Sequence, residues 1–299
     1  MRPNLLKWLL FIVLALIWGS SFLLMKRSLH YFSFYEIGAL RIIIAGLVLL
    51  PFAFRKLKKI KKKELFFLLL VGFVGNTMPA FLFTKAQTGI DSALAGILNS
   101  LTPLFTLIVG LLFFQLKTKC INVLGVFIAL IGSLVLLTIN GGHNFDYNIS
   151  YAIYIIIAVC CYSFNLNIVK YKLQNIDVVS ITSIAFALML IPLILYLFTS
   201  TDFLHQIQTE EESRYGLIYV GSLAVFCSAL ALLLFNWLIK ISGVMLSSSI
   251  TYLIPVVAIF WGISDGESFG LIDAISVLVI LFGIVLVNYK KRKSKSAHS

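Results

Sequence analysis

The chain alternates long apolar runs with short polar segments along most of its length. A helix needs about 20 residues to cross the roughly 30 Å apolar layer of a bilayer. Runs of that kind predict ten membrane helices, at residues 5–25, 34–54, 65–84, 92–114, 120–139, 151–170, 178–199, 215–238, 244–264 and 271–289. We interpret the first run as a retained membrane helix, because no cleavage site of small residues follows it.

The composition agrees with this pattern. Of the 299 residues, 60% are hydrophobic and 12% are charged. Soluble domains contain about 45–50% apolar and about 25% charged residues. The polar residues here are too few to cover a soluble surface. The composition therefore excludes a soluble globular enzyme and a disordered protein.

The positive charges predict how the chain is oriented. The net charge is +12, and nineteen Lys and Arg residues fall in segments that share a side with the N-terminus, against four in the segments on the other side. Cytoplasmic loops of membrane proteins carry such an excess. We therefore expect both termini in the cytoplasm. The basic residues then mark orientation and contact anionic lipid, rather than nucleic acid.

The two halves of the chain carry matching residues. The pairs are Phe83 with Phe235 and Pro103 with Pro255 at an offset of 152, Gly132 with Gly283 at 151, and Trp18 with Tyr162 at 144. Each half contains five runs, and five is odd, so the second half must enter the membrane from the opposite side. The fold class predicted is an all-α integral membrane protein with ten transmembrane helices in two inverted five-helix repeats. Such repeats are typical of secondary transporters, and a duplication without transport is the alternative.

Short motifs lie at specific places in these runs: Trp18-Gly19-Ser20-Ser21-Phe22, Ala39-Leu40-Arg41, Leu101-Thr102-Pro103-Leu104-Phe105 and Trp261-Gly262. With these motifs the chain resembles the EamA-type family of the drug/metabolite transporter superfamily. The resemblance covers residues 8–139 and 150–288 as two EamA-like units, with a basic cytoplasmic tail at 290–299. It implies a ten-helix transporter, often an exporter of small metabolites, amino acids or toxic compounds. Gln115 departs from the family pattern, which often has Glu there, whereas its repeat partner Glu267 keeps the acid.

Polar side chains inside the runs are candidates for binding substrate, because they are costly in lipid and face the bundle interior. Arg41 is the basic residue that lies well inside a run, and a guanidinium can bind a carboxylate or phosphate through two hydrogen bonds. The alternative role of Arg41 is that of a structural cation. For the neutral residues, the alternatives are hydrogen bonds from the side chain back to its own helix and close packing between helices. The candidates are Trp18, Ser21, Arg41, Asn76, Asn99, Ser100, Tyr162, Asn165, Ser228, Thr251 and Tyr252.

Glu36 and Asp91, near the ends of runs, are the candidates for coupling to an ion. Their alternatives are interfacial solvation for Glu36 and stabilisation of a helix N-terminus for Asp91. Six runs are expected to line the cavity: 5–25, 65–84, 92–114, 151–170, 215–238 and 244–264. The fifth and tenth runs are expected to lie at the edge.

The sequence shows no arrangement of residues typical of an enzyme active site. The four cysteines and four histidines lack metal-ligand spacing, and no catalytic constellation is visible. We expect a transporter that works by alternating access, without cofactor or metal. The expected partners are the lipid bilayer and a small-molecule substrate, with no nucleic acid and with a homodimer left open. An integral-membrane enzyme and a non-transporting receptor subunit are the alternatives.

Overall fold

The computed structural model describes residues 3–57, 60–115, 120–139, 149–242, 250, 253–266 and 269–287, and it is helical over most of them. The candidates Thr251 and Tyr252, the acid Glu267 and the tail 290–299 lie outside the described residues. The α-helices are α1 (Pro3–Ser28), α2 (Phe34–Leu57), α3 (Lys62–Gly72), α4 (Met78–Ala86), α5 (Ser92–Asn99), α6 (Thr102–Phe113), α7 (Cys120–Ile139), α8 (Ile149–Lys172), α9 (Val178–Ser200), α10 (Phe203–Thr209), α11 (Ser213–Ser222), α12 (Ala231–Ser242), α14 (Ile254–Ser264) and α15 (Leu271–Val287). Two π-helices, η1 (Phe73–Thr77) and η3 (Leu223–Leu230), continue α3 into α4 and α11 into α12.

Seven helical segments are long and apolar enough to cross a membrane: Leu5–Ser28, Phe34–Leu57, Lys62–Ala86, Ser92–Phe113, Ser150–Lys172, Val178–Ser200 and Ser213–Phe235. They coincide with seven of the ten runs expected from the sequence. Three shorter apolar helices, Cys120–Gly132, Ile254–Ser264 and Leu271–Gly283, lie within the other three runs. The protein is therefore an all-helical membrane protein.

Residues at the helix starts explain several boundaries. Asp177 accepts hydrogen bonds from the backbone N–H (2.9 Å) and hydroxyl (2.6 Å) of Ser180, and this caps α9. Prolines occupy the first turn of α6 and α14, where the missing N–H costs little because a helix start leaves that N–H without a partner. Pro103 thus separates α6 from α5, which ends at Asn99, inside one apolar run.

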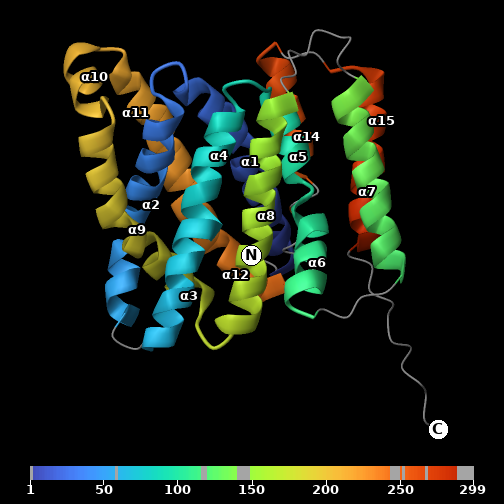
Figure 1. Cartoon of the computed structure of the whole chain (residues 1–299), viewed down its shortest axis with the longest axis horizontal. Helices are drawn as coiled ribbons and strands as arrows, with labels where there is room; N and C mark the ends of the chain where they lie inside the picture. The colour runs from blue at the N-terminus through green and yellow to red at the C-terminus, as the bar shows by residue number, and fades with distance from the viewer. Residues whose placement is uncertain are drawn as a thin grey trace.

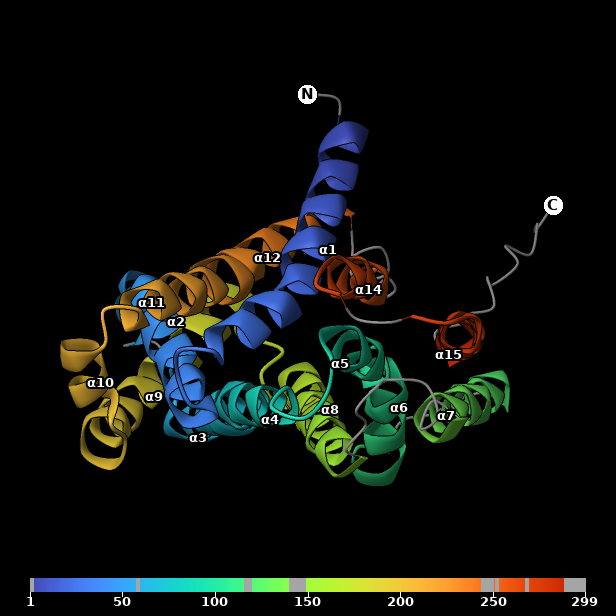
Figure 2. The same ribbon diagram turned by 90° about the horizontal axis from the view of Figure 1, so that it is seen from above.

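The helices stand side by side with α7 and α15 at one edge and α9 and α10 at the other (Figure 1). Seen from above, α4, α5, α6 and α8 form one layer between these edges, and α1, α12 and α14 form the layer opposite (Figure 2). The prediction that the fifth and tenth runs lie at the edge is confirmed. We call the end that carries α10, at the top of Figure 1, the α10 end, and the end that carries Lys61–Lys63 the basic end.

The edge pair α7 and α15 packs antiparallel through glycines. Asn122 Nδ2 donates to the Leu286 carbonyl at 3.1 Å. Farther along α7, a Cβ on Gly132 would lie 2.9 Å from Ile280 Cγ1. A Cβ on Gly283 would lie 2.5 Å from the backbone N of Ala129. By the offset of 151, Gly132 corresponds to Gly283 and Ala129 corresponds to Ile280. The contact of Gly132 with Ile280 is therefore the repeat counterpart of the contact of Gly283 with Ala129.

The pair α2 and α9 has the same relation. Gly46 of α2 lies against Leu190 and the Phe186 carbonyl of α9. Ala53, which comes later in α2, shares a hydrophobic cluster with Ile181, which comes earlier in α9. These helices are therefore also antiparallel.

Large apolar side chains cover the outside of the bundle. Leu271 is 78% exposed and Ile191 is 73% exposed. Soluble monomers rarely show apolar surface on this scale. The outer surface therefore suits contact with lipid.

Candidate functional site

Two aromatic contacts join the halves of the chain. The rings of Trp18 on α1 and Phe235 on α12 lie 5.2 Å apart, and those of Phe83 on α4 and Tyr162 on α8 lie 5.8 Å apart. The sequence offsets match Trp18 with Tyr162 and Phe83 with Phe235. Each contact is therefore the repeat counterpart of the other.

The two π-helices η1 and η3 lie at matching positions, because residues 73–77 shifted by 152 fall within η3. Asn76 Nδ2 donates to the Val71 carbonyl at 2.9 Å, and its counterpart Ser228 bonds the Leu223 carbonyl at 3.5 Å. Each bond runs from a side chain to the backbone carbonyl five residues earlier in the π-helical segment. Such segments often lie at functional sites.

Arg41, Trp18 and Ser228 come together at η3. Arg41 Nε donates to Ser228 Oγ at 3.1 Å, and Trp18 Nε1 donates to the carbonyl of the neighbouring Cys227 at 3.1 Å. Tyr162 joins them through Phe83, whose ring stacks on Tyr162 at 5.8 Å and lies 6.0 Å from Phe22, one turn after Trp18 on α1. We call the following five residues the central cluster: Trp18, Arg41, Tyr162, Cys227 and Ser228. It brings four predicted candidates together from α1, α2, α8 and η3.

Two other candidates bond to their own helix. Ser21 Oγ donates to the Trp18 carbonyl, and Ser100 Oγ donates to the Ile97 carbonyl, both at 2.6 Å. These two contacts agree with the alternative of a hydrogen bond from the side chain back to its own helix. The backbone carbonyl of a third candidate, Asn99, accepts from Thr102 Oγ1 at 2.7 Å, where α5 gives way to α6.

Asn165, one turn after Tyr162 on α8, packs against Gly75. A Cβ on Gly75 would lie 2.4 Å from Asn165 Cγ. The Oδ1 of Asn165 is buried and accepts no hydrogen bond among the described residues. This atom is an unused acceptor inside the bundle, and Asn165 stays a candidate for binding substrate.

At the α10 end, charged groups join three helices. Lys26 Nζ lies 3.3 Å from an oxygen of Asp91 and 3.9 Å from one of Asp265. Arg27 donates a hydrogen bond to Asp265. We call these four residues the ionic network. It connects the end of α1 with the start of α5 and the end of α14, so Asp91 has a structural role beside its predicted role in coupling.

Glu36 is 3% exposed. Its Oε2 accepts hydrogen bonds from the backbone N–H and the hydroxyl of Ser33, each at 2.8 Å. The Glu36 N–H donates in return to Ser33 Oγ at 3.4 Å, which makes a reciprocal helix cap at the start of α2. The alternative of interfacial solvation was therefore wrong for Glu36, because a hydrogen-bonded cap can bury a carboxylate that the sequence pattern places near water.

A cavity of about 490 Å³ lies at the α10 end, between the start of α2, the end of α9 and α10. Its lining includes Glu36, Asp202, His205 and Glu210. It does not include a residue of the central cluster. Within the described ranges, no group of three or more His, Cys, Asp or Glu residues could hold a metal ion.

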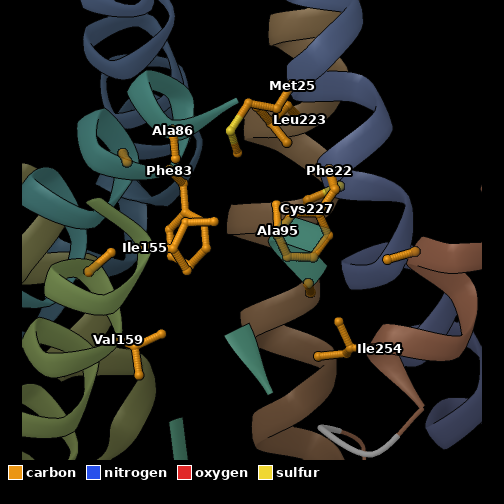
Figure 3. Packing of buried hydrophobic residues seen from close by; sticks show 14 of the residues in the cluster. Phe22, Met25, Phe83, Ala86, Ala95, Ile155, Val159, Leu223, Cys227 and Ile254 are labelled. Atoms are coloured by element: carbon orange, nitrogen blue, oxygen red, sulfur yellow. The ribbon is translucent and has the colours of Figure 1, made fainter. Parts of the chain in front are cut away.

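The sequence reasoning missed three participants: Phe83, Phe235 and Cys227. The two phenylalanines are matched as repeat partners, and each is an aromatic residue of a run expected to line the cavity. Treating every matched pair as a candidate would have found them. Figure 3 shows Phe83 of α4 facing Phe22 of α1 and Cys227 of η3. The rings of Phe22 and Phe83 lie 6.0 Å apart.

Comparisons with known proteins agree with this architecture. The chain is 27% identical over 285 residues to the "Uncharacterized inner membrane transporter YedA" of Escherichia coli strain K12, covering 93% of this chain and 89% of that protein. It is 28% identical over 138 residues to the "Probable amino-acid metabolite efflux pump" of Salmonella typhimurium, covering 44% of each chain. One solved structure, named "Crystal structure of protein", has a TM-score of 0.61 at 15% identity and covers 94% of this chain and 95% of that one. This likeness concerns the fold alone.

The model of the EamA-like transporter family matches residues 6–138 and 149–289. The match confirms the resemblance seen in the sequence motifs, and it identifies a transporter rather than an enzyme. The chain belongs to the EamA-like transporter family.

Proposed function

We propose that the chain is a secondary transporter that exports small metabolites, amino acids or drug-like compounds by alternating access through the central cluster. Its ten helices form two inverted repeats, at residues 8–139 and 150–288, in the cytoplasmic membrane. The tail at 290–299 and both termini face the cytoplasm. Substrate is held by aromatic and polar side chains rather than by a metal or a covalent bond.

The exchange of contacts between the halves is the observation that carries this proposal. The contact of Trp18 with Phe235 repeats as Tyr162 with Phe83, and the equivalent helices α7 and α15 are antiparallel. Two similar halves packed in opposite senses can exchange conformations, and the exchange opens a shared site first to one side and then to the other.

Two further observations support the orientation and the direction. Arg55, Lys56 and Lys61–Lys63 gather at the basic end, where an excess of positive charge favours the cytoplasm. The printed names of relatives describe an inner membrane transporter and an efflux pump.

Cys227 offers a direct test, because it is buried in the central cluster. In a variant carrying C120S, C160S and C161S, Cys227 becomes the single thiol. A membrane-impermeant thiol reagent should label it in both right-side-out and inside-out vesicles, since each conformation opens the site to one side. Labelling from one side only, or from neither, would contradict alternating access.

Transport itself is tested with purified protein in proteoliposomes. Compounds from metabolite pools that raise the melting temperature are bound by the folded state, and these are then assayed for flux. Flux of at least one such compound is expected, with empty liposomes as the control. Absence of flux across all of the compounds that bind would favour a non-transporting receptor subunit.

A further inference from the structure

Arg41 is a cation inside a membrane helix. It lies seven residues, or about 10 Å, along α2 from Phe34. A charge at such a depth is costly unless it faces a polar cavity or meets a partner. The ion pairs formed by the described residues involve Lys26, Arg27 and Lys56 and leave Arg41 without a carboxylate. The acid on the same helix, Glu36, turns its carboxylate to Ser33.

The guanidinium of Arg41 has unused hydrogen-bonding capacity. It carries five N–H groups. One of them, at Nε, donates to Ser228 Oγ at 3.1 Å. The other four meet no acceptor within the part of the chain that the structure describes. Their fork geometry matches the two oxygens of a carboxylate.

The surroundings of Arg41 limit the charge and shape of what it can bind. Two cations of the α10 end, Lys26 and Arg27, already contact Asp91 and Asp265, and a third, Lys85, lies over the rings of Phe34 and Tyr151. Arg41 therefore offers one positive charge, which suits one negative charge. A phosphate monoester carries between one and two at neutral pH. The rings of Trp18 and Tyr162 in the same cluster present apolar faces that suit an apolar or aromatic body.

We propose that Arg41 anchors an organic monocarboxylate whose apolar or aromatic body contacts Trp18 and Tyr162. This inference rests on the proposed function, since it names the substrate class of the same site. The carboxylate takes the free N–H groups of Arg41, and Ser228 holds the guanidinium in place through Nε. Arg41 is then the residue that sets specificity for anions.

The test compares four ligands that share a phenyl ring: 3-phenylpropionate, 3-phenylpropionamide, phenethylamine and phenyl phosphate. Binding to the purified full-length protein is measured by isothermal calorimetry and by the shift in melting temperature. Hydrogen bonds between a guanidinium and a carboxylate are stronger than those to a neutral amide, so the carboxylate should bind at least tenfold more tightly than the amide. Equal affinity of the two, or tighter binding of the amine or the phosphate, would overturn the proposal.

The variant Arg41→Gln should reduce the preference for carboxylate over amide to within about twofold, because the charge and the fork are both lost. Arg41→Lys keeps the charge and should retain part of the preference. The matched control is Arg55→Gln, the same substitution on the same helix about 21 Å away at an exposed position. It should keep the full preference. An unchanged preference in Arg41→Gln would overturn the proposal.

The comparison of ligands on the unmodified protein stands even where Arg41→Gln fails to fold. The outcomes also separate this inference from the proposed function. Carboxylate binding through Arg41 without flux supports the anchor and contradicts transport. Flux of compounds with no carboxylate preference supports transport and overturns the anchor.

Discussion

The two ends of the bundle use the same repeat geometry with different chemistry. At the α10 end, α1 meets α14, and Lys26 and Arg27 contact Asp265. At the basic end, the repeat counterparts α8 and α6 meet. By the offset of 144, Arg27 corresponds to Tyr171. By the offset of 152, Phe113 corresponds to Asp265.

Aromatic rings replace the ionic network at the basic end. Phe114 stacks with Tyr171 at 5.4 Å between ring centroids, and Phe113 lies 5.1 Å from Phe164. Ion pairs at a wet surface weaken as salt rises, whereas contacts between apolar surfaces do not depend on Debye screening. Equivalent positions in the two halves thus join their helices with interactions that respond to different conditions.

The largest expected effect is on α7 and α15, a pair of helices that the repeat relates to each other. In Gly283→Ala, the new methyl group would lie 2.5 Å from the Ala129 backbone N, which cannot rotate away. Overpacking of this kind costs about 1–3 kcal/mol, so the melting temperature and the yield of folded protein should fall. Gly221→Ala is the matched control, because no atom lies within 4 Å of its Cβ. Equal melting temperatures for the two variants would contradict the close packing of α7 and α15.

The next effect is specific to the α10 end. Asp265→Asn removes the ion pairs with Lys26 and Arg27, each worth about 0.2–1 kcal/mol at partly exposed sites. Under alternating access, labelling of Cys227 from this end should accelerate about threefold at low salt. In about 1 M NaCl, where charges are screened beyond roughly 3 Å, the wild type and the variant should become similar. An effect of the same size at both salt concentrations would argue against an ionic contribution.

A smaller effect is expected at the basic end. Phe114→Leu keeps an apolar side chain but loses the stacking with Tyr171, which contributes about 0.5–1.5 kcal/mol between buried rings and less at this half-exposed site. Labelling of Cys227 from this end should accelerate about twofold. The ratio of variant to wild type should be the same in low and high salt, and a ratio that follows salt would contradict the aromatic interpretation.

The smallest effect concerns an ion pair at the basic end. Burial raises the pKa of Asp177, but the hydrogen bonds from Ser180 and the charge of Lys56 outweigh burial and lower it. A lowered pKa stabilises the fold above the unfolded value near 3.9 and loses that contribution as pH falls through the folded value. Asp177→Asn keeps a capping oxygen and should lower the melting temperature by less than about 2 °C at pH 7. The difference should shrink as the pH falls below the unfolded pKa and through the lowered folded pKa of Asp177.

Much of the architecture follows from local sequence. The length of the apolar runs predicts the helices, because a helix of about 20 residues has to match the bilayer. The order of the matched pairs predicted that Trp18 corresponds to Tyr162 and Phe83 to Phe235. The distribution of Lys and Arg predicts an orientation, which stays a prediction.

The contacts between these helices required the tertiary structure. Trp18 and Cys227 are separated by 209 positions, and no periodicity along the chain states that the indole meets that carbonyl. The burial of Glu36 under a cap and the ion pair of Asp91 with Lys26 also depend on packing. Apolar periodicity and charge act within one helix or one loop, so a sequence by itself determines which segments enter the membrane. The fit of side chains between helices decides which polar groups meet inside it.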